Sequence, residues 1–123
     1  MNRWSQVVLL FCLCLFAGKE ATGNPLQPKA DVELGKKIFE THCKVCHGVN
    51  GDGATFAANA LNPPPRNFTT EKSRQELSPE RMLTSVSGGR EGTAMMPWAP
   101  VLSKLEIHSA VLYIRKMLMN LPE

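Results

Sequence analysis

The stretch Cys43-Lys44-Val45-Cys46-His47 decides how this chain is interpreted. Two thiols separated by two residues can each add to one vinyl group of a single haem, which gives two thioether bonds. The next residue, His47, is then carried beneath the iron, where its imidazole can act as an axial ligand. The C-x-x-C-H pattern therefore predicts one covalently attached haem c, with Cys43 and Cys46 as anchors and His47 as the proximal ligand.

Two other kinds of site use the same residue types. Two cysteines and a histidine can supply three ligands of a zinc site, which His42 or His108 would complete, although no second Cys or His cluster has finger-like spacing. A C-x-x-C pair is also a dithiol redox motif, but that motif is expected in a βαβ context. No segment of this chain alternates with the period of a strand. Both alternatives stay open at this point.

The first residues are typical of a secretory signal peptide. A positively charged start precedes an apolar stretch of eleven residues at 7–17. That is shorter than the roughly 20 apolar residues that span a bilayer. Small residues just before Asn24 predict cleavage there, with cleavage after Gly18 as the competing site and an uncleaved amphipathic anchor as the other interpretation. We therefore expect a signal peptide at 1–23, a mature domain at 24–123, and a periplasmic or otherwise exported protein.

Composition limits the remaining possibilities. The chain has 123 residues, which suits one domain, and no segment repeats at a fixed period. Its 14 basic and 11 acidic residues give a net charge of +3, and no basic run is interleaved with aromatic residues, so nucleic acid is not an expected partner. Loss of the signal peptide would leave two of the four cysteines, which excludes a disulfide framework.

Capping residues place three helices. Asp31 is a suitable N-cap for a first helix that runs towards Cys43, and Gly35 inside it indicates close approach of another element. A second helix begins near Ser78, with Pro79 at its first position, and ends near Gly88.

The last helix carries the clearest signals. Ser103 and Glu106 have capping-box spacing, and they precede one apolar stripe made of Ile107, Val111, Ile114, Leu118 and Leu121. Long loops at 47–66 and 88–100, rich in glycine and proline, separate the three helices. The sequence therefore predicts an all-α, loop-rich fold.

Over residues 31–121 the chain resembles the monohaem class I cytochromes c of the bacterial, periplasmic type. Five pieces in the family's order carry the resemblance. They are Gly35-Lys36-Lys37-Ile38-Phe39, His47-Gly48-Val49-Asn50-Gly51-Asp52-Gly53, Leu61-Asn62-Pro63-Pro64-Pro65-Arg66-Asn67-Phe68, Gly92-Thr93-Ala94-Met95-Met96-Pro97-Trp98, and the C-terminal helix from Leu102 to Arg115. The resemblance implies three to four helices wrapped around one haem.

The resemblance also implies roles for residues outside the motif. Met95 would be the distal axial ligand, since it precedes Trp98 at the family's usual spacing, while Met96 is the alternative because a proline follows it. A carbonyl in the Pro63–Pro65 loop would accept a hydrogen bond from His47. Gly35 and Phe39 would pack against Tyr113, where the first and last helices cross.

Other residues have ordinary interpretations. We expect His42 to point to solvent, and His108 to be a surface or packing residue. Three methionines at helical spacing are expected to pack rather than ligate: Met82, Met117 and Met119. Four lysines are either solvated positions or a basic docking rim around the haem edge: Lys36, Lys37, Lys44 and Lys72.

A six-coordinate haem with His and Met ligands has no open position, so the resemblance implies a monomeric electron carrier and not an enzyme. It would shuttle single electrons between periplasmic or membrane redox partners, with brief encounters and possible weak membrane association. Two alternatives remain: a haem subunit of a larger oxidoreductase complex, and a haem enzyme if neither Met95 nor Met96 binds the iron.

Overall fold

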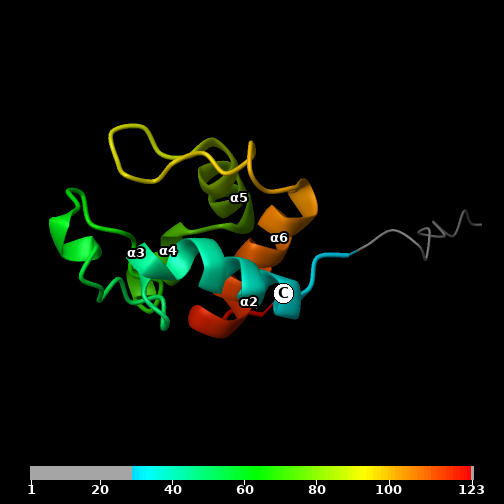
Figure 1. The fold of residues 1–123 in the computed structure, drawn as a ribbon. Helices are drawn as coiled ribbons and strands as arrows, with labels where there is room; N and C mark the ends of the chain where they lie inside the picture. Colours follow the sequence, from blue (N-terminus) through cyan, green and yellow to red (C-terminus); the bar gives the residue numbers. More distant parts are fainter. Residues whose placement is uncertain (1–28, 123) are drawn as a thin grey trace, which may run out of the picture.

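The computed structural model describes residues 29–122, and this part of the chain is helical, without a strand (Figure 1). In chain order its elements are α2 (Val32–Ile38), the π-helical η1 (Phe39–Cys43), α3 (Lys44–His47), the 3₁₀ turn η2 (Ala58–Ala60), α4 (Glu71–Glu76), α5 (Pro79–Gly88), α6 (Lys104–Tyr113) and the π-helical η3 (Ile114–Leu118). Because η1 joins α2 to α3 and η3 continues α6, the described residues form four helical stretches, which confirms the predicted fold class. The expected signal peptide, residues 1–23, lies outside this range, and no described helix is long and apolar enough to cross a membrane.

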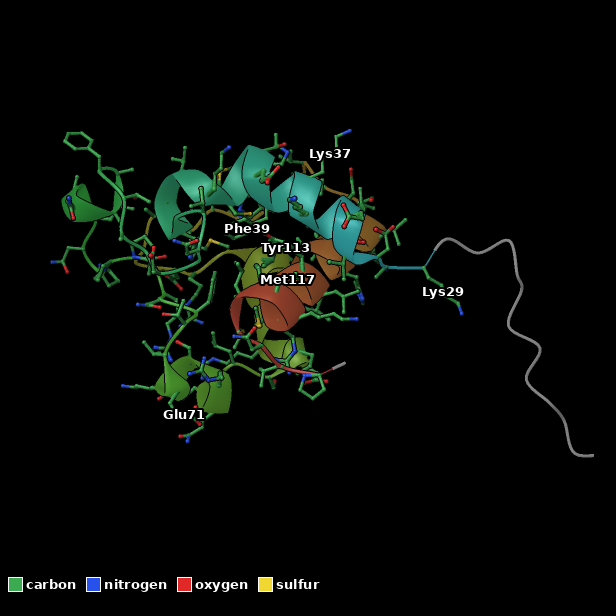
Figure 2. The ribbon with its side chains drawn as sticks, turned by 90° about the horizontal axis from the view of Figure 1, so that it is seen from below. Lys29, Lys37, Phe39, Glu71, Tyr113 and Met117 are labelled. Carbon is green, nitrogen blue, oxygen red and sulfur yellow. The ribbon has the colours of Figure 1, made fainter. Side chains whose placement is uncertain are left out.

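Helices α2 and α6 cross and pack closely against each other. A Cβ atom on Gly35 would lie 1.9 Å from the carbonyl oxygen of Ser109, so only glycine lets the two backbones approach this closely. One turn further on, the rings of Phe39 and Tyr113 pack with their centroids 5.5 Å apart. Figure 2 labels both residues between the two helices. The predicted contact of Gly35 and Phe39 with Tyr113 is confirmed.

The predicted caps also form. The Asp31 carboxylate accepts a hydrogen bond from the Leu34 N–H at 2.7 Å, and Ser78 caps α5 with Pro79 in its first turn. At the start of α6, Ser103 and Glu106 satisfy each other's backbone N–H groups in a capping box. These contacts join residues three apart, so the local sequence was sufficient to predict them.

The first helix is longer than predicted. It does not end near Cys43 but continues through η1 and α3 to His47, so the whole C-x-x-C-H motif lies on helical backbone. Gly48, with a φ of 79°, then ends it in the left-handed region that favours glycine.

Helix α4 was not predicted. Its sequence, Glu-Lys-Ser-Arg-Gln-Glu, contains no apolar residue, so it gives no hydrophobic periodicity to detect. Its start signal is Thr70, whose side chain accepts a hydrogen bond from the Ser73 N–H.

The predicted apolar stripe of the last helix is buried over its first part. Ile107, Val111 and Ile114 are all core residues, while Leu118 and Leu121 pack against the core and are partly buried. The π-helical turn that begins at Ile114 changes the buried face, so Met119 becomes a fully buried residue near the end of the chain.

Two loops matter for the site: the 48–70 loop, between α3 and α4, and the 89–102 loop, between α5 and α6. Figure 1 shows both loops, in green and yellow, extending from the helices on the same side of the molecule. The motif in α3 lies at the start of the first loop, and Met95 and Met96 lie in the second.

Candidate haem-binding site

The two cysteines of the motif are free, half-buried thiols. Burial, reinforced by the neighbouring Cys46, raises the pKa of Cys43 to about 11. Reactive dithiols depend on the opposite shift, because the thiolate is the nucleophile. The dithiol interpretation is therefore not supported. Residues 29–122 contain no strand and hence no βαβ unit, and the pKa of Cys43 is raised instead of lowered.

His47 is held from two directions by residues 66–68. Its Nδ1 atom lies 3.2 Å from the carbonyl oxygen of Arg66, and its ring is stacked on Phe68 with centroids 4.7 Å apart and planes 15° apart. A carbonyl can only accept, so Nδ1 carries the proton and the lone pair is on Nε2. Burial lowers the pKa of His47, and the Arg66 hydrogen bond opposes that shift only in part. The imidazole is therefore neutral at neutral pH, which is the form that binds metals.

The carbonyl that holds His47 is not the predicted one. We expected a carbonyl in the Pro63–Pro65 loop, but the acceptor belongs to Arg66, directly after the prolines. Residues 66–68 are brought back towards His47 where the Phe68 N–H donates to the Gly51 carbonyl at 2.7 Å. This pairing joins two parts of the 48–70 loop and has no local sequence signal. The stacking of Phe68 on His47 was missed for the same reason.

Backbone hydrogen bonds anchor the 89–102 loop to the end of α5. The Trp98 N–H donates to the Val86 carbonyl at 3.0 Å, and the Ala99 N–H donates to the Ser87 carbonyl at 3.2 Å. Within the loop, the Arg90 N–H donates to the Met95 carbonyl at 2.9 Å. Gly89, the first residue of this loop, has a φ of 71°, and a Cβ atom there would be 2.7 Å from the Met95 carbonyl oxygen. Met95 is half-buried, whereas Met96 is 50% exposed.

The prediction that His42 points to solvent is wrong. Its ring is half-buried and packs against Trp98, with centroids 5.1 Å apart. His42 lies in η1, and the wider π-helical turn alters the direction expected from an α-helix. The contact links the helix that carries the motif to the 89–102 loop.

The other histidine and the methionines mostly behave as expected. His108 is exposed on α6, and Met82 and Met119 are buried in the core. Met117 is 53% exposed, so the expectation that it packs is wrong; it lies on the outer side of the π-helical turn η3.

The donor set fits a haem and does not fit zinc. Within residues 29–122, no three His, Cys, Asp or Glu side chains are grouped so that they could hold a metal ion, and neither His42 nor His108 completes such a set. What the structure offers instead is two thiols, one neutral imidazole with a free Nε2, and a methionine loop on the same side of the molecule.

Comparison with known proteins agrees with this chemistry. The family model for cytochrome c matches residues 32–118, so the chain belongs to the cytochrome c family. Among solved structures, KustC0563, a c-type cytochrome, is 29% identical with a TM-score of 0.59, over 68% of this chain and 95% of that one. Cytochrome c6 from the diatom Phaeodactylum tricornutum shares the fold, with 24% identity and a TM-score of 0.57, over 73% of this chain and 97% of that one.

A third structure places a similar domain in a larger assembly. A chain of the Kuenenia stuttgartiensis reducing HAO-like protein complex Kustc0457/Kustc0458 is 25% identical, with a TM-score of 0.61 over 73% of this chain and 44% of that one.

No relative was found among the curated proteins. The protein is thus a monohaem class I cytochrome c, an electron-transfer protein with covalently attached haem c.

Proposed function

We propose that Cys43 and Cys46 form the two thioether bonds to the haem, that Nε2 of His47 is the proximal iron ligand, and that Met95 is the distal one. The observation that carries this proposal is the state of His47. Its Nδ1 is tied to the Arg66 carbonyl, its ring is neutral, and its Nε2 is free one residue after the second thiol. A metal-binding histidine with its other nitrogen on a carbonyl has a fixed tautomer and orientation.

Met95 is preferred to Met96 because of burial. Met95 is half-buried and its carbonyl is held by Arg90, whereas half of the Met96 side chain is exposed to solvent. A ligand to a buried iron has to project inward. Met96 then lies at the surface of the loop, where a flexible thioether is tolerated.

The haem, when bound, supplies a reversible one-electron couple, and the chain controls its surroundings. Phe68 and the core of α2 and α6 contribute an apolar wall, while Arg66 keeps the proton on Nδ1 of His47. If His47 and Met95 both held the iron, no coordination position would remain open for a substrate. The protein therefore carries electrons and does not bind a substrate at iron.

We further propose that the protein is exported, with residues 1–23 as its signal peptide, and works in the periplasm with redox proteins as donor and acceptor. The apolar stretch 7–17 supports export. Lys36, Lys37 and Lys44 are exposed and available for electrostatic steering, whereas Lys72 lies 3.8 Å from Glu76, which weakens its contribution to a basic rim.

A haem subunit of a larger oxidoreductase is the second candidate function. The similar domain in the HAO-like complex favours it, because that match shows this kind of domain inside an assembly. Native purification separates the two candidates: a free carrier elutes as a monomer, and a subunit elutes with its complex.

The central test is expression in a host with working haem-attachment machinery, followed by a haem stain after denaturing electrophoresis. The native protein should retain the stain, and the double variant Cys43→Ala/Cys46→Ala should lose it. A colourless native protein, or a stain that survives in the double variant, would contradict the proposed site.

A further inference from the structure

The helix that sequence analysis missed, α4, carries a buried serine that lies next to the support of His47. We propose that Ser73 is a positioning residue: through residues 66–68 it sets the hydrogen bond to His47 and thereby the reduction potential of the iron. This inference rests on His47 being the proximal ligand, as proposed above.

The first step concerns where the two contacts of His47 originate. Both the Arg66 carbonyl and the Phe68 ring belong to one three-residue segment. That segment is loop backbone, so it lacks the regular hydrogen bonds that would fix a carbonyl within a helix or sheet. Apart from the hydrogen bond between the Phe68 N–H and the Gly51 carbonyl, this segment has to be held by side chains.

Ser73 holds this segment in place through hydrogen bonds to Arg66 and Asn67. It is 1% exposed, and its hydroxyl donates to the Asn67 carbonyl while accepting from Arg66 Nε and from Thr70 Oγ1, each at 3.0 Å. One donor and two acceptor positions complete the capacity of a hydroxyl group. The carbonyl that bonds to His47 belongs to the peptide bond between Arg66 and Asn67. Ser73 bonds to a group on each side of this peptide bond, the Arg66 Nε and the Asn67 carbonyl.

Helix α4 is itself fixed in place. The Arg66 guanidinium also pairs with Glu76 at its far end. Beyond that end, Arg115 in η3 donates through Nη1 to the Leu77 carbonyl at 2.6 Å. The support of His47 is therefore connected, through α4, to the C-terminal helix, and a six-residue helix without apolar side chains has a structural role.

The consequence for the iron has a definite direction. A hydrogen bond from Nδ1 to a carbonyl makes the imidazole a stronger donor, which favours oxidised iron. Loosening it should raise the potential. A general opening of the site to water would instead lower the potential. Burial of the haem is one of the factors that set its potential, and water stabilises the extra charge of ferric iron.

The test is the midpoint potential of holoprotein carrying Ser73→Ala. A hydrogen bond of ordinary strength corresponds to about a two- to tenfold change in an equilibrium constant. We expect the reduction equilibrium to shift by that factor in favour of ferrous iron, which is about 20 to 60 mV for a one-electron couple. Ser73→Thr, which keeps the hydroxyl, should restore most of the original value.

Ser109→Ala is the matched control. Ser109 is also fully buried, but its Oγ accepts a hydrogen bond from the Asp31 N–H at 3.2 Å, at the start of α2 and not in the 66–68 segment. It should lower stability without moving the potential. If Ser73→Ala fails to fold, Glu76→Gln, which weakens the grip on Arg66 from the surface of α4, should give a smaller upward shift.

An unchanged or lowered potential in a folded Ser73→Ala variant would overturn the inference, as would an equal shift in Ser109→Ala. The haem stain separates this outcome from failure of the proposed site. If Ser73→Ala retains covalent haem but has a native potential, only the role of Ser73 is wrong.

Discussion

The two loops that face the haem differ in how the polypeptide holds them. In the 48–70 loop, Gly51 and Phe68 are buried, and residues 66–68 of this loop fix the proposed ligand His47 by a hydrogen bond and a stacked ring. In the 89–102 loop, no residue from Gly89 to Val101 is buried by the protein, and the loop is held by backbone hydrogen bonds to the end of α5. The surroundings of His47 are therefore fixed by the polypeptide alone, whereas the 89–102 loop would depend on the proposed bond between Met95 and iron.

The largest expected effect comes from breaking that bond. Met95→Ala should lower the midpoint potential by on the order of 0.2 V, a fraction of the roughly 0.8 V that axial ligands span, because thioether ligation favours ferrous iron. The weak sulfur-to-iron absorption band of the oxidised protein should disappear.

Met96→Ala is the comparison for that experiment. Since Met96 is 50% exposed, the band should persist and the potential should stay close to native. The reverse result, with the band lost only in Met96→Ala, would transfer the ligand role to Met96.

The next prediction tests the close contact between α2 and α6 at Gly35. Gly35→Ala would place a Cβ atom 1.9 Å from the Ser109 carbonyl, so α2 and α6 must separate, and the free energy of unfolding should fall by about 3 kcal/mol. Denaturant titration of the holoprotein measures this loss.

Gly88→Ala provides its control. Nothing lies within 4 Å of a Cβ atom at Gly88, in the last turn of α5, so this variant should be neutral or slightly stabilising. Equal losses in both variants would mean that the α2–α6 contact is not the cause.

A smaller effect is expected from a substitution in the 89–102 loop. Gly89→Ala would direct a Cβ atom at the backbone of Met95 and Met96, at 2.7 Å from the Met95 carbonyl oxygen. The loop should shift, and external imidazole should displace the methionine at about tenfold lower concentration, equivalent to about 1.4 kcal/mol.

Gly92→Ala carries the same backbone strain without the collision. Its φ is 75°, close to the 71° of Gly89, but nothing lies within 4 Å of its Cβ position. It should bind imidazole like the native protein. If both variants respond alike, the left-handed backbone, and not the contact with Met95, controls the loop.

The smallest effect concerns the cap of α6, which directly follows the 89–102 loop. Hydrogen bonds from the Ser103 backbone and hydroxyl hold the pKa of Glu106 below its ordinary value of 4.5. Its contribution to stability is therefore complete above about pH 4.5 and is lost as the pH falls through the lowered pKa.

Glu106→Gln keeps the capping geometry but cannot titrate, so its stability should fall less between pH 5 and pH 3 than that of the native protein. Glu33→Gln, an exposed substitution in the first turn of α2, is the control and should leave the native slope in place. Parallel pH profiles for native protein and Glu106→Gln would contradict the assignment.

Prediction from sequence succeeded where neighbouring residues decide the outcome. The caps at Asp31, Ser78 and Ser103 join groups three residues apart, and Gly35 indicated a close contact because glycine is unfavourable in the interior of a helix. It failed at α4, where the hydrophobic signal is absent, and at His42, where a π-helical turn replaced the expected periodicity.

By itself, the sequence determined the chemistry of this protein: two thiols and an imidazole in fixed order, helix starts, and a methionine in a later loop. Those features depend on bonds and spacings along the chain. Only the tertiary structure decided that Arg66 supplies the carbonyl for His47, that Phe68 stacks on its ring, and that Ser73 in α4 bonds to the Arg66 side chain and the Asn67 carbonyl. These contacts join residues brought together by folding of the 48–70 loop, and no local pattern of residues records how a loop folds back on itself.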